Sequence, residues 1–265
     1  MYQGRYFTRS RVNVCGDYID ADIYPVFQPA GKRRKKCKPT SEIQKKLNQR
    51  NAAKHLVHMV RSNFGPEDMA EHLTYRPGEE PGTMEEARRD LYNYIRRLKR
   101  IYKKRGIELK YISCTEKGKK SGRYHHHLIV TGGVDRDTLE KAWGKGYANS
   151  KRLQFEEDGM AALAHYMVKD ETSFRRWNGS RNLCQPEPIV KDNEYTMGDV
   201  DEMREAIESR SAHQYFEARF PGYELIEADC TQNGVNRGWY ISFEMRKRKE
   251  NRSRRSGCQA AEKYA

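Results

Sequence analysis

The sequence predicts an α+β fold with an antiparallel central sheet flanked by helices. Strand and helix patterns follow one another as strand, helix, strand, strand, helix, and two neighbouring strands are joined by a polar loop as in a hairpin. Aromatic residues make up 11% of the 265 residues, which is enough for a packed core. This order of elements does not suit a doubly wound parallel sheet.

The first fifty residues are predicted to form a basic N-terminal arm and the start of the first helix. The arm contains the apolar stretch 19–27 and the basic run 31–39. From Ser41 onward apolar residues recur at helical spacing, and Gly65 with Pro66 ends this helix. A short strand is predicted at 71–75.

The clearest helix of the sequence follows a capping box formed by Thr83 and Glu86 and ends at Gly106. Its apolar residues fall on one stripe, and its other face is basic. This basic face could contact phosphates, or it could be an ordinary solvated face.

The remaining elements complete one predicted domain over residues 51–245. In order, they are strands at 108–115 and 124–131, helices at 136–145, 159–169 and 199–210, and a late pair of strands at 223–230 and 238–245. Residues 246–265 are expected to form a basic tail.

The charge balance favours a polyanionic partner. Fifty-one Lys and Arg residues against 37 Asp and Glu residues leave a formal net charge of +14. The sequence contains no apolar run of the ~20 residues that a membrane span needs and no apolar N-terminal leader. The six cysteines are scattered without Cys-x-x-Cys spacing. We therefore expect a cytoplasmic protein with free thiols, no membrane partner, and a nucleic acid as ligand.

Three adjacent histidines in the second hairpin strand indicate a metal site. Side chains alternate along a strand, so His125 and His127 point to the same side, with Cα atoms roughly 7 Å apart, while His126 points away. Glu116, at the end of the partner strand, could add an oxygen ligand. Two imidazoles and one carboxylate suit Mg²⁺ or Mn²⁺. The alternative is that the triplet is a surface accident.

A tyrosine and a lysine on the helix predicted at 159–169 are a second candidate. Tyr166 and Lys169 are three residues apart and therefore adjacent on a helix face. A lysine beside a tyrosine can favour the phenolate, which is a nucleophile. The same spacing also occurs in ordinary amphipathic contacts.

Together these segments resemble the three ordered motifs of HUH endonucleases that initiate rolling-circle replication. The motifs are Leu73-Thr-Tyr75, then His125-x-His127 preceded by Glu116, then Tyr166-x-x-Lys169, and the resemblance covers roughly residues 63–182. It is closest to the single-tyrosine replication initiators of plasmids and single-stranded-DNA phages. His126 departs from the family, which usually has a bulky hydrophobic residue there.

The resemblance implies a ferredoxin-like or RRM-like HUH domain that nicks and rejoins single-stranded DNA at a replication origin. Tyr166 would form a 5′-phosphotyrosine, with Lys169 orienting the phosphate or phenolate. The divalent metal would be held by Glu116, His125 and His127, and a host polymerase and helicase would be partners. Alternatives are a transposase or relaxase with the same chemistry, and a non-catalytic DNA-binding protein on the same fold.

Basic and aromatic residues near these motifs are candidates for DNA contact. They are Lys117, Lys119, Lys120, Arg123, Tyr124, Arg175, Arg176 and Trp177. Trp177, with Phe174, could instead cap the core.

Overall fold

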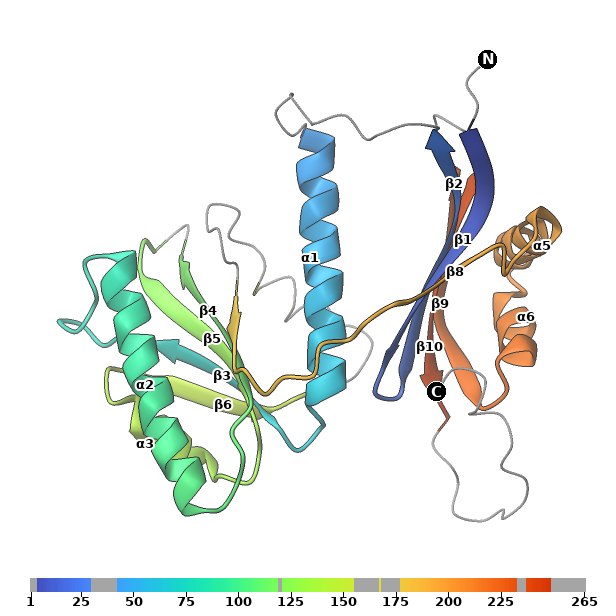
Figure 1. The fold of residues 1–265 in the computed structure, drawn as a ribbon. Coiled ribbons are helices and arrows are strands. Elements are labelled where there is room, and N and C mark those ends of the chain that lie inside the picture. The colour runs from blue at the N-terminus through green and yellow to red at the C-terminus, as the bar shows by residue number, and fades with distance from the viewer. Residues whose placement is uncertain are drawn as a thin grey trace, which may run out of the picture. The chain divides into compact units, whose positions relative to one another are not determined.

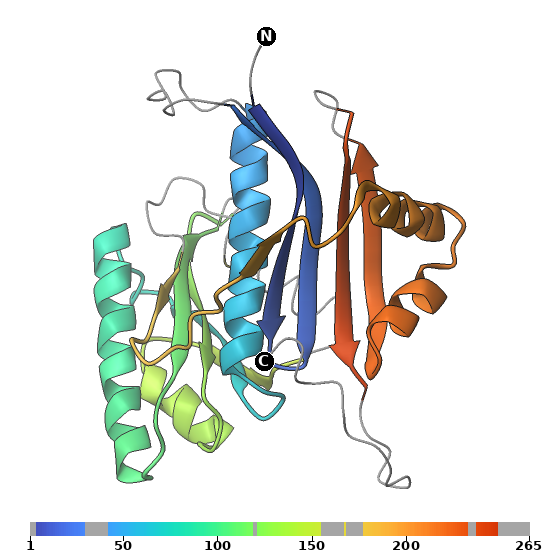
Figure 2. The same ribbon diagram turned by 45° about the vertical axis from the view of Figure 1, so that its right-hand side comes forward.

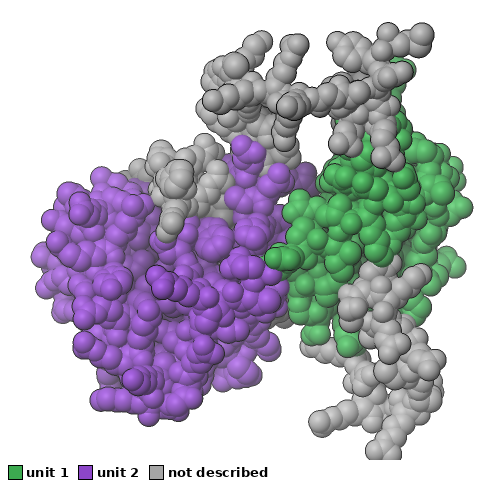
Figure 3. Space-filling view, viewed as in Figure 1, with its two compact units in different colours: residues 1–38, 186–265 green, residues 39–185 purple. Residues whose placement is uncertain are grey.

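The computed structural model describes residues 4–29, 42–118, 121–154, 167, 177–232 and 237–248. The chain divides into two compact units (Figure 3). Residues 39–185 form the central unit, and residues 1–38 with 186–265 form the terminal unit. Each unit has its own five-stranded antiparallel sheet and its own helices, which confirms the predicted α+β class. Within the described ranges, no helix is long and apolar enough to cross a membrane.

The central unit is built around one sheet whose middle strand is β5. Its strand order is β6-β3-β5-β4-β7. The strands are β3 (Met69–Thr74), β4 (Tyr111–Lys117), β5 (Tyr124–Val130), β6 (Ala148–Arg152) and β7 (Asn178–Gly179), and the helices are α1 (Glu42–Asn63), α2 (Met84–Lys104) and α3 (Arg136–Trp143).

Strand alternation separates two apolar clusters on the two faces of this sheet. On one face, Ile112 and Ile129 pack with residues of α1 such as Leu56. On the other face, Leu128 packs with α2 and α3, including Trp143. Figure 1 shows α1 on one side of this sheet and α2 with α3 on the other.

Helix α2 forms where the capping residues and the apolar stripe predict it. The Thr83 side chain accepts a hydrogen bond from the Glu86 backbone N–H, and the helix ends just before Gly106, which has φ +69°. The predicted hairpin is also present, because β4 and β5 pair antiparallel from Tyr111 opposite Val130 to Lys117 opposite Tyr124. Both predictions are confirmed.

The terminal unit joins both ends of the chain in one sheet of order β8-β1-β2-β10-β9. The strands are β1 (Gly4–Cys15), β2 (Tyr18–Pro29), β8 (Ile189–Asp192), β9 (Tyr223–Gln232) and β10 (Trp239–Lys247), and the helices are α5 (Met197–Glu208) and α6 (Ala212–Arg219). Both helices cover one face, where Met203 and Phe216 pack on Ile23 and Phe243 (Figure 2).

The ends of the chain differ from the sequence expectation. Residues 4–29, expected to belong to a basic arm, form the hairpin β1–β2, and the late strands pair with it in a separate unit. Small polar side chains at buried positions of β1, such as Thr8 and Ser10, hide the alternation that marks a strand. The boundary near residue 186 depends on pairing between segments more than 200 residues apart, such as Ile23 with Ile241.

Candidate metal centre

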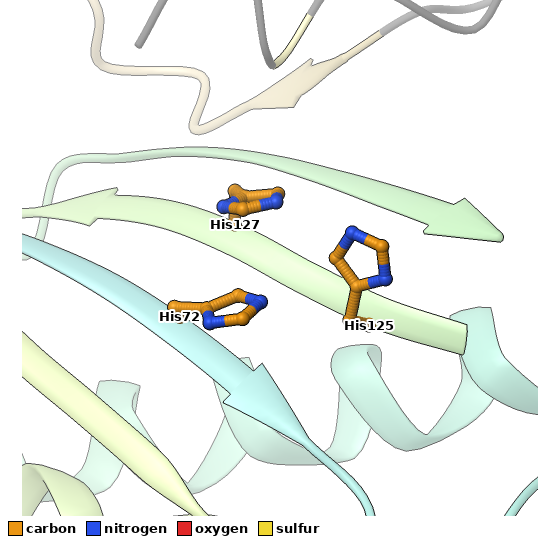
Figure 4. Close-up of side chains that lie close together, drawn as sticks. All are labelled: His72, His125 and His127. Atoms are coloured by element: carbon orange, nitrogen blue, oxygen red, sulfur yellow. The ribbon is translucent and has the colours of Figure 1, made fainter. Parts of the chain in front are cut away.

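Three neighbouring strands bring three histidines and one glutamate to one face of the central sheet. In the strand register, His72 of β3 lies opposite His127 of β5, and Glu116 of β4 lies opposite His125 of β5. Figure 4 shows the three imidazole rings gathered over β3 and β5. This is the face whose apolar part packs against α1.

The distances within the cluster suit a single ion. His72, His125 and His127 each offer a ring nitrogen, and these nitrogens all lie within 4.8 Å of one another. The rings of His72 and His127 are stacked with centroids 4.7 Å apart. Glu116 Oε2 lies 3.3 Å from His125 Nε2, so a carboxylate adjoins the imidazole cluster. The four side chains together form a nitrogen-rich donor set.

Burial and mutual repulsion keep these imidazoles neutral. Desolvation, with the nearby rings of His72 and His125, lowers the pKa of His127 to about 4. Removal of part of the ring from water, together with His125, also lowers the pKa of His72. A neutral imidazole offers a lone pair, which is the form that binds a metal.

The environment of Glu116 supports the fit of a cation. The residue is buried, with 8% of its surface exposed, and its Oε1 atom is shielded from water without a hydrogen-bond partner among the described residues. A buried carboxylate oxygen in this condition is costly unless a positive charge is nearby. A divalent ion held by Glu116 and the three imidazoles would supply that charge.

His126 lies on the opposite face and belongs to the core. It is fully buried, and its two ring nitrogens lie 2.8 Å from the Tyr75 hydroxyl and 2.9 Å from the Thr115 hydroxyl. Burial lowers the pKa of His126 to about 3, and the ring also contacts Trp143. Because both nitrogens have hydrogen-bond partners, a histidine fits where the resembled family usually has a hydrophobic residue.

The structure brings together all three residues predicted as metal ligands, Glu116, His125 and His127. It adds His72, which sequence reasoning missed. The available signal was its place on the strand predicted at 71–75. Nothing in the sequence states that β3 is adjacent to β5 in the register that places His72 opposite His127.

Several predicted site residues lie outside the described residues. They are Tyr166, Lys169, Lys119, Lys120, Arg175 and Arg176. The immediate neighbour of Tyr166 is described: Met167 is helical and buried in the same cluster as Ile112 and Ile129. The chain at Met167 therefore lies on the sheet face that carries the histidines.

The other candidates for DNA contact are not brought to the histidines. Tyr124 packs against the apolar cluster on the opposite face, with Lys117 Nζ 5.2 Å from the centre of its ring. Arg123 is exposed and lies 4.0 Å from Glu80. Trp177 is half-buried against the cluster beneath α1 and lies 6.0 Å from the His55 ring, which is the position of a core-capping residue.

Comparison with known proteins gives one match. Residues 70–171 match the family of the replication-associated protein ORF2. No curated protein and no solved structure matches the chain. The matched segment contains the whole donor cluster as well as Tyr166 and Lys169. The similarity supports a role as a replication initiator that acts on DNA.

Proposed function

We propose that this chain is a rolling-circle replication initiator of the HUH type, a metal-dependent nuclease that nicks and rejoins single-stranded DNA through a tyrosine. The observation that carries the proposal is the cluster of His72, His125, His127 and Glu116 on one sheet face, within the segment similar to replication-associated proteins. The burial of Met167 on that face supports Tyr166, the adjacent residue, as the nucleophile.

In the proposed reaction the tyrosine replaces one phosphate ester by another. The Tyr166 phenolate oxygen bonds to the phosphorus, and the bond from phosphorus to the 3′ oxygen of the preceding nucleotide breaks. The products are a 5′-phosphotyrosine and a strand whose 3′ oxygen takes up a proton to give a hydroxyl. Attack by a 3′-hydroxyl on the phosphotyrosine reverses the step and rejoins a strand. Lys169 orients the phosphate or the phenolate.

The donor set also indicates which ion is preferred. A bound divalent ion would polarise the phosphate oxygens and offset the negative charge that develops during attack. Mg²⁺ prefers oxygen ligands, whereas imidazole nitrogens favour transition metals. With three imidazoles and one carboxylate available, we propose that Mn²⁺ binds this site more tightly than Mg²⁺.

A covalent-capture assay tests the proposed function. The full chain is incubated with a pool of short single-stranded oligonucleotides and Mn²⁺, and a denaturing gel is examined for a protein–DNA adduct. We expect an adduct that disappears with EDTA and with Tyr166→Phe. Tyr147→Phe is the matched control, because Tyr147 is 75% exposed in the same unit and loses only a hydroxyl.

The outcomes separate the alternatives. An adduct that persists in Tyr166→Phe would assign the nucleophile elsewhere. Binding without any adduct, across a broad pool and with either metal, would favour a non-catalytic DNA-binding protein on this fold.

A further inference from the structure

The outer side of α2 carries a line of exposed cations around one tyrosine, which we name the α2 stripe. Its residues lie at successive intervals of three or four positions and therefore along one side of the helix. They are Arg88, Arg89, Tyr92, Arg96, Lys99, Arg100 and Lys103, and all seven are exposed. At 1.5 Å per residue the stripe is about 22 Å long.

The charges of the stripe are not neutralised within the part of the chain that the structure describes. Arg89, Arg96, Lys99, Arg100 and Lys103 form no ion pair with a described carboxylate. The side-chain contacts that Arg96 and Lys99 do make are with aromatic rings, those of Tyr92 and Tyr111, at 6.0 Å and 5.9 Å from the ring centres.

Like charges at this spacing repel one another, as with Arg96 and Arg100 four residues apart. Elsewhere the chain neutralises such cations: Arg204 on α5 lies within ion-pair distance of both Asp201 and Glu208. A solvated helix face is typically built from pairs of opposite sign, as on α5. A face with a single sign of charge instead matches an anionic ligand.

The stripe lies on the side of the central sheet opposite to the histidines. Helix α2 packs through Leu98 onto Leu128, whereas His125 and His127 project from the other face of the same strand. A ligand on the stripe is therefore separated from the metal centre by the sheet.

We propose that the α2 stripe binds the phosphate backbone of double-stranded DNA that flanks the cleaved strand. The choice of DNA rests on the proposed function. The duplex form is argued from the stripe itself, which is straight, ~22 Å long and dominated by Arg and Lys. Duplex DNA carries a charge per ~1.7 Å of axis and suits such a row of point contacts. Single strands are held mainly by several stacking aromatics, and the stripe exposes Tyr92 alone.

This arrangement would keep paired and unpaired DNA on different faces. Phosphate contacts position a duplex without reading its sequence. With the duplex held on α2, a strand must leave the helix to reach His125 and His127 on the other side of the sheet. The stripe would thus position the origin while the metal centre acts only on a separated strand.

Duplex binding by the full chain tests the proposal without cleavage. Fluorescence anisotropy with a 20-base-pair duplex of random sequence is measured in EDTA over a range of salt concentrations. The triple variant Arg89→Gln, Arg96→Gln, Arg100→Gln is expected to bind at least about tenfold more weakly near 0.1 M salt. Its slope of log affinity against log salt should fall in magnitude by about 3.

A control with the same loss of charge uses exposed cations of the terminal unit: Arg11→Gln, Arg210→Gln, Lys247→Gln. It should stay within about twofold of the unchanged chain. Unchanged duplex affinity in the stripe variant, or an equal loss in the control, would overturn the proposal. An unchanged duplex affinity with loss of binding to an RNA hairpin would overturn it in favour of RNA.

A further arm separates this proposal from the proposed function. The stripe variant should form the covalent adduct on a short single-stranded oligonucleotide as the unchanged chain does. A matching loss of adduct would place the stripe on the single-strand path and overturn duplex docking. Absence of adduct in the unchanged chain would refute only the nuclease.

Discussion

His72 lies between the other two imidazoles of the cluster, with ring centroids 4.7 Å from His127 and 5.4 Å from His125. It is the most exposed of the three, and it comes from a different strand. Its role as a ligand would tie β3 to β5 through the ion, in addition to their backbone hydrogen bonds.

Replacing His72 should weaken metal binding directly. We expect His72→Asn to lower Mn²⁺ affinity at least tenfold, because one of three imidazole donors is lost. Isothermal titration calorimetry measures this, with His213→Asn on α6 as an exposed control that should change nothing. Equal affinities for His72→Asn and the unchanged chain would remove His72 from the donor set.

Glu71, the neighbour of His72, points to the other face and is buried in the core. Burial raises the pKa of Glu71 to about 7, even though the Tyr94 hydroxyl donates a hydrogen bond to its Oε2 at 2.9 Å. The folded chain therefore holds a proton on Glu71 at a pH where the unfolded chain has released it.

This buried carboxyl should make stability fall as pH rises. Between about pH 4.5 and pH 7 the folded state binds more protons, so the free energy of unfolding decreases through that window, by on the order of 3 kcal/mol for this group. Glu71→Gln keeps a hydrogen-bond partner for Tyr94 and removes the titration. Urea unfolding at pH 5 and pH 8 should show a smaller pH dependence in the variant; identical slopes would contradict the prediction.

At the scale of elements, the end of β3 depends on a close approach by the loop before β6. A Cβ atom at Gly146 would lie 2.3 Å from the Thr74 carbonyl oxygen and 2.5 Å from the Arg76 nitrogen. These are backbone atoms that cannot rotate away. Glycine at position 146 thus allows the loop to pack against the strand that carries His72.

Gly146→Ala should displace the end of β3. We expect a loss of about 1–3 kcal/mol in the free energy of unfolding, with weaker Mn²⁺ binding, since the strand must move away from the added methyl group. Gly65→Ala is the control, because a Cβ atom there meets nothing within 4 Å. Thermal unfolding and calorimetry of both variants provide the comparison, and equal behaviour would show that the loop adapts freely.

Elements differed in how far local sequence predicted them. Helix α2 combines a cap, an apolar stripe and a C-terminal glycine, so its bounds follow from residues within one segment. Strand β1 has buried Thr8 and Ser10 at inward positions, and its partner strands decide its structure. The pairing of β4 with β5 was predictable because the hairpin loop is short, whereas the place of β3 beside β5 was not.

At the scale of the whole molecule, each unit has an apolar core of its own. The central unit contains two clusters, one on each face of its sheet, and the terminal unit contains a third. All the described residues of the metal centre belong to the central unit. A unit with its own core can fold independently.

The central unit should therefore retain the metal centre when isolated. We expect residues 39–185, expressed alone, to unfold cooperatively and to bind Mn²⁺ within about threefold of the full chain. Circular dichroism and calorimetry check both statements. A fragment without cooperative unfolding would show that the terminal unit is needed for the central fold.

The sequence by itself determined the α+β class, helix α2, the β4–β5 hairpin and the shared face of His125 and His127, because each follows from a local period or a short turn. Tertiary structure alone decided the two-unit division, the strand pairing that joins both ends of the chain, and the addition of His72 to the cluster. These features depend on which distant strands pair and in which register, and local patterns do not specify either.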